Sequence, residues 1–191
     1  LLLAFLLAVM YMTNAWDGLI YLLLSIIFIT VYTTYKNNKL HLSYENIYEM
    51  FKKTIIIIIG FFAFSLPFSI NFKPFVSGIG FICAPTFLTK IEKFGPFLFE
   101  PNHCQRSPIW QLLILYGFFY FFVFSFVVFL KTKKDYKITV SDLFVIMLIL
   151  LSSLLIIVPE FVYIKDIYPL HYRANTMFKL TYEAFIMLSI S

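Results

Sequence analysis

Long apolar runs alternate with short polar stretches along the whole chain. Residues 18–35 carry no charge, and their number is close to the roughly 20 residues with which a helix crosses a bilayer core. Apolar runs of this kind occupy 1–12, 18–35, 54–70, 108–130, 142–158 and the residues from about 175 onward. We therefore predict an all-α fold, a polytopic transmembrane helix bundle with about six spans, because lipid leaves the backbone of a lone strand unpaired.

Polar and proline residues predict where these helices begin and end. Ser43 is placed to cap a short surface helix at 44–53 that precedes the third span, and Pro67 is expected to bend or end that span. Ser107 and Pro108 read as the N-cap and first residue of the fourth span. The dipeptide Ser141-Asp142 is expected to cap the fifth span.

Residues 71–107 form a long connection that contains four prolines and three glycines. Connections of this length inside a compact domain are usually functional or disordered, and the many phenylalanines here argue against disorder. We expect an outer loop that lies in the membrane interface or re-enters the protein partway, where other segments satisfy its backbone.

Composition supports a membrane protein and excludes a soluble fold. The chain is 61% hydrophobic, 21% aromatic and only 13% charged, and its mean hydropathy is +0.89. It begins without an initiator Met, and both ends lie inside apolar runs. We therefore expect residues 1–191 to be a single membrane domain fragment, truncated at both ends.

The basic residues predict how the chain is oriented. The net charge of +5 does not indicate a nucleic-acid partner, because the Lys and Arg residues lie between apolar spans. Connections 36–53 and 131–140 hold eight of them in 28 positions, whereas 13–18, 71–107 and 159–173 hold six in 58. By the positive-inside rule the first set is cytoplasmic, which places the long loop, Asp17 and the charged stretch 159–173 on the extracytoplasmic face.

Cys83 and Cys104 lie in the long connection without a metal-binding spacing. Unpaired buried thiols are the favoured interpretation, and a disulfide is the alternative.

Charge is concentrated near the C-terminal end, where a 21-residue stretch holds Glu160, Lys165, Asp166, His171, Arg173 and Lys179. Ionisable groups beside membrane spans usually mark a site or an internal partner. If Asn175 caps the sixth span, Arg173 and Lys179 flank the positive end of a helix, an arrangement suited to binding a phosphate or a phosphate-bearing lipid. The alternative is that both cations reach out to lipid headgroups.

Further along the same helix, Glu183 follows Lys179 by four residues, so the two side chains share one face. A carboxylate at this depth needs a partner, and we favour a structural pair over a functional one.

Three acidic residues are candidates for catalysis or for binding a sugar. Asp17, supported by Asn14 and Trp16, could act as a general base, metal ligand or acceptor for sugar hydroxyls, or equally as a helix cap. Glu160 and Asp166 present the same alternatives. His171 is a candidate proton carrier or ligand, but it lacks a second His or Cys at ligand spacing. We predict no dedicated metal motif; a divalent cation is the one cofactor considered.

Several motifs resemble the YYY membrane proteins of archaea and Chloroflexi, an uncharacterised family. Asn14-Ala15-Trp16-Asp17 is similar to that family's Asn-x-Trp-Asp element. Its other elements are similar to Ser65-Leu66-Pro67-Phe68, Val76-Ser77-Gly78-Ile79-Gly80, Pro159 to Asp166, and Arg173-Ala174-Asn175-Thr176-Met177-Phe178-Lys179. Lys165 stands where Arg is usual, which keeps the charge but loses the bidentate geometry.

The span pattern of that family is similar to that of the GT-C glycosyltransferases. The resemblance implies transfer of a sugar from a polyprenyl-phosphate donor at the outer membrane face. In GT-C enzymes the essential acid lies in the first outer loop, upstream of this chain, so the resemblance does not assign that role to Asp17. Our leading hypothesis is a GT-C-like glycosyltransferase. The rivals are a transporter or lipid-handling protein with Lys179 and Glu183 lining a pathway, and a structural membrane subunit.

Overall fold

The computed structural model describes residues 1–36, 39–40, 43–74, 76–132, 136–167 and 169–191. It confirms the predicted helical membrane bundle. Among the described residues, four apolar segments are long enough to cross a membrane: Ala15–Thr34, Tyr44–Ser69, Ile109–Thr132 and Val140–Glu160. They correspond to the predicted second to fifth spans. The first and the sixth predicted spans coincide with α1 (Leu2–Thr13) and α7 (Ala174–Ile190).

The chain divides into two compact units. The first comprises Leu1–Lys73 with Lys134–Leu148, and the second comprises Pro74–Lys133 with Ile149–Ser191. Helix α6 (Val140–Ile157) contributes its first half to one unit and its second half to the other.

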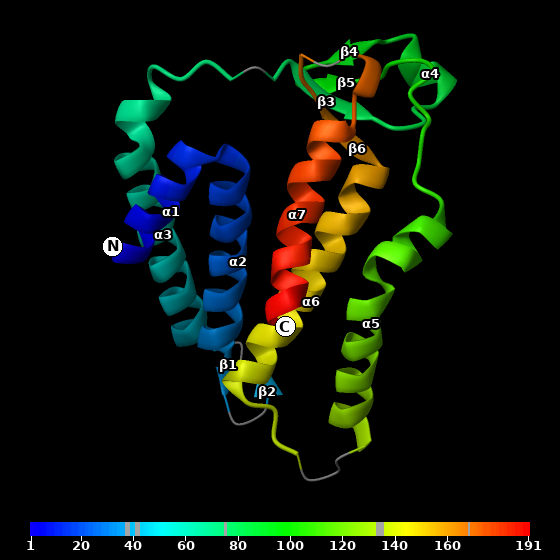
Figure 1. Ribbon diagram of the computed structural model, residues 1–191. Coiled ribbons are helices and arrows are strands. Elements are labelled where there is room, and N and C mark those ends of the chain that lie inside the picture. Colours follow the sequence, from blue (N-terminus) through cyan, green and yellow to red (C-terminus); the bar gives the residue numbers. More distant parts are fainter. Residues whose placement is uncertain (37–38, 41–42, 75, 133–135, 168) are drawn as a thin grey trace. The chain divides into compact units, whose positions relative to one another are not determined.

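In the first unit, α1, α2 (Ala15–Thr34) and α3 (Tyr44–Ser69) pack against one another (Figure 1). Their core is formed by Leu7, Ala8, Leu22, Ile57 and Phe61. A two-stranded antiparallel sheet of β1 (Tyr35–Lys36) and β2 (Lys39–Leu40) follows α2. At Gly18 an added Cβ would lie 2.4 Å from Cα of Tyr11, so the absence of a side chain lets α1 and α2 approach closely.

The N-terminal ends of α2 and α3 are set by side-chain caps. The Ser43 hydroxyl accepts a hydrogen bond from the Asn46 amide, which confirms the predicted cap of α3. The short surface helix and the third span, predicted as separate elements, form this one helix, because no helix breaker separates them. Pro67 lies in its last turn. Helix α2 begins before the predicted Gly18, because Asn14 caps it.

Three other predicted helix starts are wrong by one or two residues. Helix α5 (Ile109–Thr132) begins after Pro108, whose carbonyl accepts the first helical hydrogen bonds, while Ser107 contacts other segments. Helix α6 is capped by Thr139, which exchanges hydrogen bonds with Asp142 in a capping box. Helix α7 has Arg173 at the N-cap position, so the predicted cap Asn175 is already helical.

In the second unit, the long connection folds into a small sheet. Strands β3 (Gly78–Phe81), β4 (Lys93–Phe94) and β5 (Phe97–Leu98), together with the short helix α4 (Thr86–Thr89), come from residues 71–107. They join β6 (Val162–Lys165), which follows the 3₁₀ turn Val158–Glu160, in the order β4-β5-β3-β6. The sheet lies beyond the C-terminal end of α6 and the N-terminal end of α7 (Figure 1).

The pairing of β3 with β6 positions the charged stretch. These strands are antiparallel, with Gly78 opposite Lys165 and Gly80 opposite Tyr163. The aromatic ring of Tyr163 lies against Gly80, where an added Cβ would be 2.1 Å from the ring carbon Cζ. Tyr163 is fully buried and forms a core with Ile82 and Tyr172. Sequence analysis did not predict these strands, because each has only two to four residues and β6 pairs with a strand more than 80 residues away.

Candidate functional site

A buried ion pair joins the two ends of the charged stretch. Nη2 of Arg173 lies 2.5 Å from Oε1 of Glu160, and each side chain is only 11% exposed. Glu160 is positioned by the 3₁₀ turn after α6, and Arg173 by the start of α7. The pair therefore ties the C-terminal end of one apolar helix to the N-terminal end of the next.

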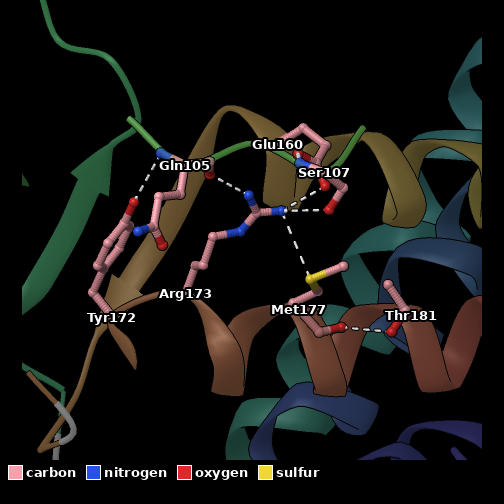
Figure 2. A network of polar contacts seen from close by, with 7 residues as sticks. All are labelled: Gln105, Ser107, Glu160, Tyr172, Arg173, Met177 and Thr181. Carbon is pink, nitrogen blue, oxygen red and sulfur yellow. Dashed lines mark hydrogen bonds and ion pairs between the residues drawn. The ribbon is translucent and has the colours of Figure 1, made fainter. Parts of the chain in front are cut away.

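Gln105 and Ser107, from the long connection, complete this network (Figure 2). The amide of Ser107 donates to Oε2 of Glu160 (2.7 Å), and its hydroxyl accepts from Nη2 of Arg173 (3.2 Å). The carbonyl of Gln105 accepts from Nη1 of Arg173, and its amide donates to the hydroxyl of Tyr172 (3.1 Å). Both oxygens of Glu160 are thus taken by internal donors, so in this structure Glu160 positions Arg173 instead of facing a ligand.

An open cavity of about 360 Å³ lies beside the network. Its lining includes Arg106, His171 and Arg173, together with Ala174 at the start of α7. Arg106 is exposed, stacks over the ring of Phe161 at 5.1 Å, and makes no ion pair with any residue that the structure describes. The cavity therefore combines cations with a helix N-terminus, an arrangement that favours anions.

Of the three residues predicted from the sequence to bind an anion, only Arg173 lines the cavity. Arg173 lines the cavity but is engaged by Glu160, whereas Asn175 and Lys179 lie further along α7 and are not part of the lining. His171, in the turn Pro169–His171, is exposed and lines the cavity. The predicted role of Asn175 and Lys179 in phosphate binding stays a prediction.

A second cluster surrounds Glu100, a residue that sequence reasoning did not single out. Its Oε1 accepts from Nζ of Lys165, and its Oε2 accepts from the hydroxyl of Tyr163 (2.6 Å). Nδ1 of His103 lies 2.5 Å from the same hydroxyl and 3.3 Å from Oε2 of Glu100. The His103 ring stacks on Tyr172 with 3.9 Å between ring centroids. Tyr172 thus contacts both clusters.

The electrostatics of this cluster favour an ionised Glu100 beside a neutral Tyr163. Burial raises the pKa of Glu100, but hydrogen bonds from Lys165 and Tyr163 and the positive charges of Lys165 and His103 outweigh burial, so the net pKa is lowered. Burial, together with the hydrogen bond to the Glu100 carboxylate, raises the pKa of Tyr163 well above its ordinary value. At neutral pH the Glu100 carboxyl is therefore ionised, and the Tyr163 hydroxyl keeps its proton.

Cys83 and Cys104 form a disulfide, so the favoured interpretation of unpaired thiols is wrong. Their Cα atoms are 4.4 Å apart. The turn that follows β3 brings Cys83 to the segment after Glu100, where its amide donates to the carbonyl of His103 (2.8 Å). The separation of 21 residues gave no sign of this proximity.

Asp17 lies in the first turn of α2, in the first unit. Its Oδ1 accepts a hydrogen bond from Nδ2 of Asn14 (2.7 Å), and Oδ1 of Asn14 accepts from the Trp16 amide. The structure therefore brings Asn14 and Asp17 together at the cap of α2. The predicted location of Asp17 on the same membrane face as the charged stretch 159–173 stays a prediction.

Two other predicted residues lie in the second unit away from the cavity lining. Asp166 follows β6 and is half-buried. Glu183 is buried on α7, with 3% of its surface exposed. Its predicted pairing with Lys179 stays a prediction. Among the described residues, no group of three or more His, Cys, Asp or Glu side chains is arranged to hold a metal ion.

Sequence reasoning did not assign Glu100, Gln105 or Tyr163 to a site, gave His103 little weight, and interpreted Ser107 only as a helix cap. The one available signal was the presence of a carboxylate and an imidazole in an otherwise apolar connection. Apart from the His103–Glu100 contact, the partners described above are 53 or more residues away in sequence, and no periodicity reveals such pairs.

Comparison with known proteins identifies the family to which the chain belongs. No curated protein and no solved structure matches the chain. Residues 1–142 and 137–188 match a family described as uncharacterized membrane protein (DUF2298). Because the match extends over nearly the whole chain, the protein is a multi-pass integral membrane protein that belongs to the DUF2298 family.

Proposed function

We propose that this chain is part of a membrane-embedded glycosyltransferase that takes its sugar from a polyprenyl-phosphate donor at the extracytoplasmic face. The observation that carries the proposal is the cavity beside the start of α7, where Arg106 and His171 face open space. A phosphate bound there would contact charge-assisted donors, which stabilise negative charge as the bond to the sugar breaks.

The second unit also offers a place for the lipid chain of such a donor. An apolar groove of about 470 Å³ is lined mainly by Phe118, Phe119, Phe122 and Phe126 of α5 and by Leu188 near the other end of α7. From residue 174 to residue 188, α7 rises by about 21 Å at 1.5 Å per residue. A long isoprenoid could thus place its phosphate at one end of α7 and its chain along the apolar groove.

Two observations support the extracytoplasmic location. The connections rich in Lys and Arg are 36–53 and 131–140, which the positive-inside rule assigns to the cytoplasm. The disulfide between Cys83 and Cys104 lies in the opposite set of connections, and disulfides persist mainly in oxidising compartments. The resemblance to the YYY proteins, and through them to GT-C glycosyltransferases, is consistent with chemistry on this face.

The proposed roles follow from what each residue contacts. Arg106 and His171 bind the donor phosphate, and Glu160 with Ser107 positions Arg173 at the edge of the cavity. Asn175 and Lys179 remain proposed contacts further along α7. Glu160 is engaged internally, and Asp166 in the same unit stays a candidate carboxylate for the sugar.

The test is sugar transfer by the full-length protein in proteoliposomes, with a polyprenyl-phosphate-linked sugar as donor. Arg106→Gln removes the exposed cation of the cavity and should lower transfer by about tenfold or more, since hydrogen bonds to charged groups contribute about 1.5–3 kcal/mol. The matched control is Lys90→Gln, which removes an exposed cation of the same unit outside the cavity lining.

Equal transfer by Arg106→Gln and the control would contradict the phosphate site. If the wild-type protein binds the donor but transfers no sugar to any acceptor, the result would favour a lipid-handling protein, which the same cavity and apolar groove also fit.

A further inference from the structure

Residues 103–107 cross the cavity side of the second unit without forming a helix or strand, and we call this segment the strap. Its position depends on contacts with other segments. The Gln105 amide donates to Tyr172, the Gln105 carbonyl accepts from Arg173, and the Ser107 amide donates to Glu160. Since Gln105, Arg106 and Ser107 line the cavity, the strap is one of its walls.

The disulfide is a second covalent attachment of the strap to the sheet, in addition to the backbone that leads from β5. Cys104, within the strap, is bonded to Cys83, which follows β3. Cys83 has a φ of 56°, in the left-handed region that non-glycine residues rarely adopt, so its conformation is maintained by its surroundings. Without the bond, the strap would depend on a few hydrogen bonds and on the stacking of His103 on Tyr172.

We infer that the Cys83–Cys104 disulfide is a redox-sensitive tie that keeps the strap docked on Glu160 and Arg173 and so maintains the wall of the cavity. Cys104 is exposed, so a reducing dithiol can approach it. In the reaction the S–S bond breaks, the two protein sulfurs gain two electrons and two protons, and the dithiol becomes a disulfide. The inference concerns the same cavity but does not depend on which ligand the cavity binds.

Hydrogen exchange on the full-length protein in nanodiscs tests this inference, with dithiothreitol as the reductant. In the oxidised protein the amides of Gln105 and Ser107 are protected by Tyr172 and Glu160. After reduction, exchange in the peptide that covers the strap should become about tenfold faster or more, because the strap then opens locally. The amides that pair β3 with β6 should keep their exchange rates.

The double variant Cys83→Ser/Cys104→Ser, without reductant, should show the same fast exchange in the strap. If this variant does not fold, reduction of the wild-type protein provides the measurement, with maleimide labelling to confirm that both thiols are free. Unchanged exchange after complete reduction would overturn the inference, as would two reactive thiols in the untreated protein.

Discussion

Single residues decide the stability of the region next to the membrane. The Glu160–Arg173 pair is almost fully removed from water, and further hydrogen bonds link it to Ser107 and Gln105, although the buried Nε of Arg173 has no hydrogen-bond partner among the described residues. Breaking a buried pair by removing one partner leaves an uncompensated charge, which is far more costly than losing a pair at the surface. The network therefore tolerates the loss of both charges better than the loss of one.

We predict that Glu160→Gln lowers the free energy of unfolding by about 3–5 kcal/mol, because Arg173 then stays buried without a counter-charge. Thermal unfolding in detergent measures the loss. The control Lys52→Gln breaks the Lys52–Glu49 pair, whose side chains are 54% and 49% exposed, and should cost less than about 1 kcal/mol. Equal effects of the two substitutions would contradict the buried pair.

Glu100 gives a prediction on pH. Because its pKa in the folded protein is lowered from the ordinary value of 4.5, the folded state binds its proton less readily than the unfolded state does. The stabilisation is present above about pH 4.5 and is lost as the pH falls through the lowered pKa. Unfolding temperatures between pH 7 and pH 3 should show this loss, and Glu100→Gln should flatten the profile. If the unfolding temperature of the variant depends on pH as steeply as that of the wild type, the lowered pKa of Glu100 is contradicted.

At the level of elements, the small sheet depends on the close approach of β3 to β6. Gly80 in β3 leaves room for the ring of Tyr163, and that ring holds Glu100 and His103 in place. The register of two short strands thus determines the geometry of the cluster.

Gly80→Ala should destabilise the second unit by about 1–3 kcal/mol or more, because the new methyl group overlaps a fully buried ring that cannot move aside. The matched substitution Gly117→Ala, in α5, meets no atom within 4 Å and should be neutral or slightly stabilising, since Ala favours helix by about 1 kcal/mol. Thermal unfolding compares the two. A neutral Gly80→Ala would show that the β3–β6 register differs from the one described.

At the level of the whole molecule, apolar helices alternate with connections that differ in charge. The positive-inside rule predicts that the Lys- and Arg-rich connections are cytoplasmic and that the connection with the disulfide lies on the other side. We therefore propose that the second unit's sheet is extracytoplasmic.

We predict that a cysteine introduced by Phe94→Cys reacts with a membrane-impermeant maleimide in intact cells, whereas one introduced by Glu49→Cys reacts only after permeabilisation. Phe94 and Glu49 are both exposed, and the two native cysteines are protected as a disulfide. The opposite labelling pattern would invert the topology and remove the support for the proposed site.

By itself, the sequence determined that the chain forms membrane helices, roughly where they lie, and that charge concentrates at 159–179. Lipid imposes this locally, because each apolar segment must satisfy its own backbone hydrogen bonds. The Ser43 cap was also predictable, because a helix cap involves only residues that are close in the sequence.

Only the tertiary structure decided which partners meet. Glu100 pairs with Lys165, Ser107 with Glu160, and Cys83 with Cys104. The first two contacts join segments that the pairing of β3 with β6 brings together, and this pairing aligns residues more than 80 positions apart. The disulfide depends on the chain reversal within 71–107, where β3 pairs with β5. The pattern of apolar and charged residues indicates that a buried polar side chain needs a partner. Which residue becomes that partner depends on strand register and chain reversal, and local periodicity encodes neither.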